Sequence, residues 1–215
     1  MTDHHTRAPG DAADEHADVP NHHAHHAGFH GWRGTLMAFK FLVRRREDSQ
    51  LACDLAGIGS GDHVVDIGCG SGITVRAALK RGATVTGIDP APVMLRVARL
   101  TTWRRGATWL EGTAEALPVG DASADAAWSL ATVHHWHDVD RGLAEAIRVL
   151  EPGGRFVAIE AERVIGATDH RSHGWTMPQA EAFGEAMRTH GFGDIEIGTS
   201  TVKRGDIIWI KGVAA

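Results

Sequence analysis

The sequence predicts a doubly wound α/β domain, with a seven-stranded, mostly parallel sheet and an antiparallel hairpin at its carboxyl-terminal edge. Two patterns predict this fold. From residue 63 onward, short apolar runs of strand length alternate with segments of helical periodicity, and such alternation is typical of right-handed crossovers around a parallel sheet. Residues 194–210 instead contain two apolar runs with no helical segment between them, which indicates a hairpin.

Each element follows from its own local pattern. Parallel strands are predicted at residues 63–67, 84–88, 108–110, 126–130 and 155–159, and hairpin strands at 194–202 and 207–210. Helices with apolar residues at 3.6-residue spacing are predicted at about 72–81, 91–102, 140–150 and 178–190. Upstream, a helical pattern covers residues 36–57 and is interrupted near 47–49. Asp48 or Ser49 is expected to cap its second part, which the glycine-rich residues 57–61 end.

The chain divides unevenly by composition. Its 215 residues fit one domain with an appendage. Eight of the 15 histidines fall in the first 30 residues, which carry a net charge of −4 and almost no apolar residue larger than alanine. Such a stretch cannot bury enough surface to fold alone. We therefore expect a disordered tail at residues 1–31, a helical cap at 32–60 and the main domain at 61–215.

Charge and cysteine content restrict the partners. The chain outside the tail has a net charge of only −1 and no sustained basic stripe, so we expect a small-molecule partner and no nucleic acid. Cys53 and Cys69 form neither a disulfide framework nor a CxxC pair, which is typical of a reducing compartment. No apolar run is long enough for a membrane span or a signal peptide. We expect a cytoplasmic protein, monomeric or homodimeric, that does not contact the membrane.

The most informative segment is a buried-type strand that leads into a glycine-rich loop. Asp66 lies in the strand, and Gly68, Gly70 and Gly72 follow. Glycines let the backbone approach a ligand closely, and the next helix offers unpaired N–H groups to an anion. Asp89 ends the second strand, where its carboxylate can accept the hydrogen bonds of a ribose diol. A nucleoside ligand is therefore predicted.

Two familiar nucleotide sites do not fit this loop. The dinucleotide fingerprint needs a small residue at position 73, which is Ile73 here. A P-loop sequence is missing from the chain. Glycine-rich strand-to-helix turns also occur in α/β proteins that bind no nucleoside, so the loop by itself leaves that alternative open.

Further motifs resemble the class I S-adenosylmethionine-dependent methyltransferases, in their type 11 or UbiE-like branch. Residues 65–72 (VDIGCGSG) are similar to the first motif of the family, and residues 87–90 (GIDP) to the acidic end of its second strand. Residues 112–118 (GTAEALP), 125–138 and 148–154 (RVLEPGG) follow in the family order. The chain departs from the family at Ala124, where phenylalanine is usual, which indicates a repacked loop.

The resemblance implies S-adenosylmethionine as the cofactor and assigns residues to it. Asp66 would meet the ammonium of its methionine part, Asp89 the ribose, Ala114 with Glu115 the adenine, and Ser129 with Leu130 the methionine part. The remaining cofactor-binding candidates lie in the same loops: Gly68, Cys69, Gly70, Gly72 and Pro90.

Histidines are the candidate catalytic residues. His134 and His135 are the nearest candidates for a general base, with His170 and His173 as weaker ones. A packing role for the pair at the start of a helix is the alternative. No metal site is predicted, because a flexible histidine tract such as residues 22–26 has no fixed coordination geometry.

The predicted function is methyl transfer to a small-molecule acceptor. Two alternatives use the same fold. One is a non-catalytic protein that binds the cofactor or handles metal ions, and the other is a methyltransferase for RNA or protein. The near-neutral charge and the lack of an added binding domain disfavour the nucleic-acid reading.

Overall fold

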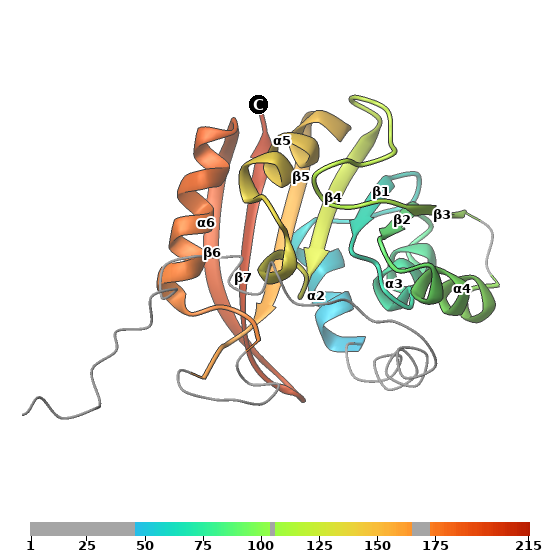
Figure 1. The fold of residues 1–215 in the computed structure, drawn as a ribbon, viewed down its shortest axis with the longest axis horizontal. Helices are drawn as coiled ribbons and strands as arrows, with labels where there is room; N and C mark the ends of the chain where they lie inside the picture. Colours follow the sequence, from blue (N-terminus) through green and yellow to red (C-terminus); the bar gives the residue numbers. More distant parts are fainter. Residues whose placement is uncertain (1–45, 104–105, 165–172) are drawn as a thin grey trace, which may run out of the picture.

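The computed structural model describes residues 46–103, 106–164 and 173–215. Their strands form a seven-stranded sheet in the order β3-β2-β1-β4-β5-β7-β6 (Figure 1). Neighbouring strands from β3 to β5 are parallel. Strand β7 runs antiparallel to both β5 and β6. The predicted fold class is therefore confirmed, including the antiparallel hairpin at the edge.

The strands of the sheet are β1 (His63–Ile67), β2 (Thr84–Asp89), β3 (Ala107–Glu111), β4 (Ala124–Leu130), β5 (Leu150–Ala161), β6 (Phe192–Val202) and β7 (Gly205–Ala214). The helices are α2 (Arg46–Leu55), α3 (Ile73–Lys80), α4 (Pro92–Thr101), α5 (Val139–Val149) and α6 (Met177–Thr189), with a short 3-10 helix η1 (Val133–His135). The four helices after β1 begin and end within one residue of their predicted bounds.

The strands at the carboxyl-terminal edge are longer than predicted. Val202 pairs with Gly205, so the hairpin turn is only Lys203 and Arg204. Strand β5 starts at Leu150, where it pairs with Ala124 of β4. Polar residues in these extensions hide them from a hydrophobic pattern, whereas pairing with a neighbouring strand satisfies their backbone groups.

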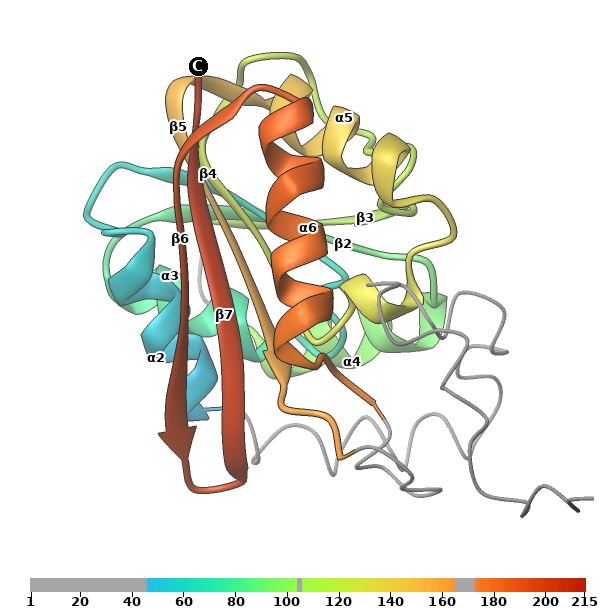
Figure 2. The same ribbon diagram turned by 90° about the vertical axis from the view of Figure 1, so that its left-hand side faces the viewer.

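Helices cover both faces of the sheet, and each face has its own hydrophobic core. Figure 2 shows α2 and α3 on one side of the sheet and α5 and α6 on the other. Val64, Val85 and Trp128 pack on the side of α2, α3 and α4. Val65 and Ile67, the alternate residues of β1, pack on the side of α5 and α6. This alternation explains the continuous apolar runs of the central strands, because both faces of a parallel sheet are buried.

The predicted cap of α2 is wrong. The helix begins at Arg46, so Asp48 and Ser49 lie in its first turn, and both are buried. Asp48 Oδ2 accepts a hydrogen bond from Arg204 Nε at 2.8 Å. Glu47 Oε2 accepts one from the backbone N–H of Lys203 at 2.7 Å. The polar run that looked like an interruption of the helix therefore binds the tip of the β6–β7 hairpin, 156 residues away.

We expect Asp48→Ala to destabilise the protein by about 3 kcal/mol, because it leaves a largely buried guanidinium without its partner. The side chains of Asp48 and Arg204 are 2% and 17% exposed. Urea unfolding followed by circular dichroism measures the change. The matched control is Asp54→Ala in the same helix, whose ion pair with Arg81 is 65% exposed on the Asp54 side, and which should cost less than about 1 kcal/mol. Equal effects of the two variants would contradict this account.

The fold positions one end of the sheet for ligand binding. The arrows of β4 and β5 point in the same direction in Figure 1. The loops after the parallel strands β1, β2 and β4 therefore meet at the carboxyl ends of these strands, where open α/β sheets bind their ligands. Among the described helices, none is long and apolar enough to cross a membrane.

Candidate active site

The loop after β1 requires glycine for two different reasons. Gly68, Gly70 and Gly72 all have positive φ angles, of 76°, 51° and 76°. A Cβ atom on Gly68 would lie 2.5 Å from Cγ2 of Thr132, so the two loops touch there. A Cβ atom on Gly70 would meet no atom within 4 Å. Gly68 thus serves close packing, while Gly70 faces open space at the ligand edge of the sheet.

Gly72 joins the loop to α3. It is the N-cap of this helix and, as a glycine, offers no side-chain oxygen to the N–H groups of the first turn. A Cβ atom on Gly72 would lie 2.5 Å from the ring of Trp109 on β3, and one on Gly87 would lie 2.8 Å from the same ring. The indole of Trp109 therefore fixes the underside of the loop, and the helix N-terminus keeps its N–H groups for an anion.

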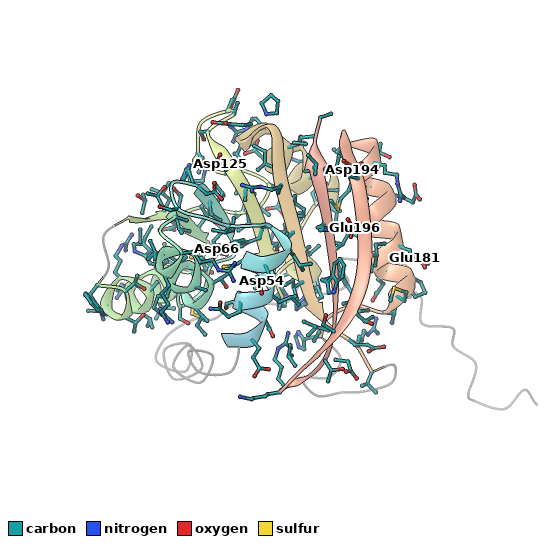
Figure 3. All side chains as sticks on the ribbon, turned by 180° about the vertical axis from the view of Figure 1, so that it is seen from behind. Asp54, Asp66, Asp125, Glu181, Asp194 and Glu196 are labelled. Atoms are coloured by element: carbon teal, nitrogen blue, oxygen red, sulfur yellow. The ribbon has the colours of Figure 1, made fainter. Side chains whose placement is uncertain are left out.

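Asp66 is a fully buried carboxylate behind the loop. It is 1% exposed, and its Oδ2 atom has no hydrogen-bond partner among the described residues. Burial raises the pKa of the Asp66 carboxyl to about 7; the nearby Trp128 indole opposes this shift, and the negative charge of Asp89 adds to it. In Figure 3, Asp66 lies toward the carboxyl ends of the strands and Asp125 toward their amino ends. Such a group is suited to a cationic partner.

Asp89 holds the glycine loop through its backbone. Its Oδ2 accepts a hydrogen bond from Gly70 N at 2.9 Å, and its Oδ1 accepts one from Ala91 N at 2.8 Å. Burial raises the pKa of the Asp89 carboxyl, while these two N–H donors lower it. The neighbouring Pro90 is exposed. Cys69 is a buried free thiol whose pKa is raised by burial and by the charges of Asp66 and Asp89.

The end of β4 closes the site from the other side. The hydroxyls of Ser129 and Thr132 are hydrogen-bonded to each other, and Thr132 Oγ1 donates to the Ile67 carbonyl at 3.1 Å. Ser129 and Leu130 are both buried. Thr132 therefore ties the loop after β4 to the end of β1, directly against Gly68.

Glu115 has a structural role that the sequence did not suggest. Its Oε1 accepts hydrogen bonds from the backbone N–H groups of His137 and Asp138, at 2.7 and 3.3 Å. Ala114 is buried within the core on the α5 side. The carboxylate of Glu115 thus fixes the entry to α5, and the backbone of residues 114–115 is the part that can face an adenine.

His134 forms a buried pair with an acid that sequence reasoning did not single out. Its Nδ1 lies 2.8 Å from Oε2 of Glu160, and the two side chains are 4% and 0% exposed. Glu160 lies near the carboxyl end of β5, beside β4 in the sheet. His135 is exposed, and its ring centroid lies 4.1 Å from that of His134. His173 comes from the segment after β5, while His170 lies outside the described residues.

Three residues of the site were missed because no sequence pattern assigned a role to them. Thr132 and Trp109 act as packing partners of glycines, which a sequence pattern does not pair. Glu160 carried a weak signal, because an acid at the end of a strand that is otherwise apolar is costly to bury unless it has a partner.

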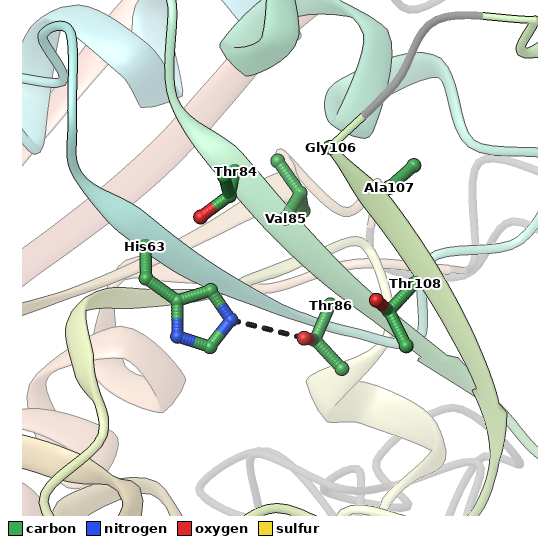
Figure 4. Close-up of a pocket in the computed structure, with 7 residues that line it drawn as sticks. All are labelled: His63, Thr84, Val85, Thr86, Gly106, Ala107 and Thr108. Atoms are coloured by element: carbon green, nitrogen blue, oxygen red, sulfur yellow. Dashed lines mark hydrogen bonds between the residues drawn. The ribbon is translucent and has the colours of Figure 1, made fainter.

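An open hollow of about 400 Å³ lies at the opposite end of the strands. It is lined by His63, by Gly106 and by neighbouring residues of β2 and β3 (Figure 4). The His63 ring lies within hydrogen-bond distance of Thr86 Oγ1 and the Ser123 carbonyl, at 2.9 and 2.6 Å. These contacts are at the amino ends of the strands, away from the glycine loop.

Comparisons with known proteins indicate a family for the domain that carries the site. Residues 65–158 match a family described as a methyltransferase domain. The chain is 38% identical over 110 residues to a demethylmenaquinone methyltransferase of Tropheryma whipplei, covering 51% of this chain and 46% of the relative. It is 37% identical over 139 residues to a demethylmenaquinone methyltransferase of Thermobifida fusca, covering 63% and 59%. The chain thus matches about half the length of these curated relatives.

Solved structures share the fold of this chain. A methyltransferase solved in complex with the Trm112 methyltransferase activator of Haloferax volcanii superposes with a TM-score of 0.70 at 23% identity, covering 84% of this chain and 93% of that one. S-adenosylmethionine is the cofactor of the family that the sequence motifs, the domain match and the sheet order all indicate. Residues 65–158 therefore form a methyltransferase domain of the class I S-adenosylmethionine-dependent family, in its type 11 branch.

Proposed function

We propose that this protein transfers the methyl group of S-adenosylmethionine to a small-molecule acceptor. The observation that carries the proposal is the pairing of a buried, unpartnered carboxylate oxygen on Asp66 with the open space in front of Gly70. An anion behind a glycine loop suits a ligand with a cationic group, and it would disfavour a pyrophosphate. The residues therefore fit the cofactor of the family.

Different residues around the loop would contact different parts of the cofactor. Asp66 would hold its ammonium group, the N-terminus of α3 its carboxylate and Asp89 its ribose. The backbone at Ala114 and Glu115 would meet the adenine, and Ser129 with Leu130 would border its methionine part, with Gly68, Cys69, Gly70, Gly72 and Pro90 forming the wall between these contacts. When bound, the sulfonium supplies an electrophilic methyl group.

The acceptor side is proposed to lie at His134 and His135. The carboxylate of Glu160 orients the His134 ring through Nδ1. Either imidazole can then take the proton of an acceptor hydroxyl, and exposed His135 can pass it to water. Holding the acceptor at the correct distance and angle is the larger task of the protein.

The acceptor class is argued from charge and from the relatives. Outside the first 30 residues the chain has a net charge of only −1, which disfavours binding to a phosphate backbone. Two relatives are named for demethylmenaquinone, a quinone. We propose a ring hydroxyl compound, of the phenol or hydroquinone class, as the acceptor of this protein.

Calorimetry and a turnover assay test the proposal together. S-adenosylhomocysteine should bind with one-to-one stoichiometry and raise the melting temperature through linkage. The wild-type protein should also transfer radioactive methyl from S-adenosylmethionine to members of a panel of phenols and hydroquinones. Glu160→Gln should lower kcat and leave KM nearly unchanged. If neither compound binds at saturating concentration, the methyltransferase proposal fails. Binding without transfer to any acceptor would favour a non-catalytic role.

A further inference from the structure

Three histidine side chains come together beside the proposed acceptor site. His134, His135 and His173 each offer one ring nitrogen as a ligand atom. These three nitrogens all lie within 4.8 Å of one another. The ring centroid of His173 lies 5.5 Å from that of His134 and 5.7 Å from that of His135. His134 is buried, His173 is half-buried and His135 is exposed. The cluster therefore has a protein side and an open side.

The three rings come from two segments of the fold. His134 and His135 belong to η1, directly after β4. The backbone next to His173 is anchored to the end of β5, because Trp175 N donates to the Ala161 carbonyl and Arg163 N to the Trp175 carbonyl, both at 2.8 Å. Gly174 has a φ of 110°, and a Cβ atom there would lie 2.0 Å from the Ala161 carbonyl oxygen. Glycine at this position lets the segment pass close to β5 and brings His173 to the pair.

A buried carboxylate supports the cluster from behind. Glu160 engages Nδ1 of His134 at 2.8 Å, so coordination by this ring would use Nε2. Histidines that bind metal ions commonly give their second nitrogen to a carboxylate in this way, which fixes the ring and strengthens it as a ligand. A structural packing role of η1 requires neither the buried acid nor the third histidine.

We propose that His134, His135 and His173 bind a divalent transition-metal ion of the zinc type, with Glu160 as the orienting carboxylate. Three imidazoles and an open fourth position are the ligand set of a catalytic zinc site. Bonds of about 2.0–2.1 Å place tetrahedral nitrogens about 3.4 Å apart, so the rings close on the ion by shifts of about 1 Å. Rotation of the exposed His135 and half-buried His173 side chains provides these shifts.

The site deepens the proposed function and rests on it for its chemical role. A hydroxide bound to the ion takes the proton of the acceptor hydroxyl and leaves as water, and the acceptor oxygen binds the ion as an anion. The metal-bound hydroxide would then replace the histidines as the general base. The anionic acceptor keeps the electron pair with which it attacks the methyl group.

Cobalt binding to the full-length chain tests the site without turnover. After dialysis against a chelator, one equivalent of Co²⁺ should produce the intense visible bands of four-coordinate cobalt, and Zn²⁺ should displace it. His173→Ala and His135→Ala should each remove these bands, whereas Glu160→Gln should weaken metal affinity about 10–100-fold. The tail control replaces His22, His23, His25 and His26 together with alanine and should keep the bands.

The outcomes separate the metal site from the tail and from the proposed function. Bands that survive His173→Ala, or that vanish in the tail control, would overturn the proposal. Binding of S-adenosylhomocysteine by each variant shows that the domain is folded. If it binds while cobalt does not, only the metal site is wrong, and the opposite result refutes the methyltransferase proposal alone.

Discussion

Asp89→Ala is expected to weaken the binding of S-adenosylhomocysteine by about 100-fold or more, since hydrogen bonds to a charged group contribute about 1.5–3 kcal/mol each and a tenfold change in affinity corresponds to about 1.4 kcal/mol. Two effects add. The variant removes the carboxylate proposed to bind the ribose diol. It also removes the acceptor that holds Gly70 N at 2.9 Å and Ala91 N at 2.8 Å, so the glycine loop loses its anchor.

Two further variants separate these effects by calorimetry. Asp89→Asn keeps one oxygen acceptor for the loop but loses the charge, so its affinity should lie between those of the wild type and Asp89→Ala. Glu181→Ala removes an exposed carboxylate on α6, far from the loop (Figure 3), and should bind like the wild type. An Asp89→Ala protein that binds within threefold of the wild type would exclude Asp89 from the cofactor site.

The second large effect is a pH dependence controlled by Asp66. Its carboxyl has a pKa of about 7 in the unliganded fold and about 4 in an unfolded chain. The native state therefore keeps the Asp66 carboxyl protonated up to about pH 7. The raised pKa stabilises the fold fully below about pH 4, and this contribution is lost as the pH rises through 7. Three pKa units correspond to about 4 kcal/mol, so relative to Asp66→Asn the unliganded protein should lose stability between pH 5 and 7.5.

Cofactor affinity should change in the opposite direction. An ammonium group placed beside Asp66 favours the carboxylate, so binding below pH 7 releases a proton and affinity rises by up to tenfold per pH unit. Calorimetry of S-adenosylhomocysteine in buffers of different ionisation enthalpy measures that proton directly. The window ends near pH 7.5, because the Asp66 carboxyl, with its pKa of about 7, is then already ionised in the unliganded protein and binding releases no further proton.

Asp66→Asn provides the control for both measurements. Its affinity for S-adenosylhomocysteine should depend little on pH. That affinity should be close to the wild-type value at pH 5.5 and weaker than the wild-type value at pH 7.5. Asp89 and the Cys69 thiol also face this region with raised pKa values, and both remain in the variant. A wild-type affinity that is constant from pH 5.5 to 7.5, with no proton released, would refute the assignment of Asp66 to the ammonium.

Elements with a strong local pattern could be predicted from the sequence. The apolar strands β1, β2 and β4 and the helices that follow them have periodicities that depend only on neighbouring residues. The same applies to Gly68, Gly70 and Gly72, because a positive φ angle is a property of one residue. The cap of α2 was mispredicted for the converse reason. Asp48 resembles a helix cap locally, yet it is buried by Arg204 on a hairpin that no local pattern connects to it.

What the sequence by itself determined is the order of strands and helices, the glycine loop and the family of methyltransferases to which they belong. Tertiary structure alone decided which side chains meet. Glu160 reaches His134 because β5 lies beside β4 in the sheet, and His173 reaches both histidines because Gly174 lets its segment pass against β5. The physical reason is that secondary structure follows from neighbours along the chain, whereas a site follows from neighbours across the sheet.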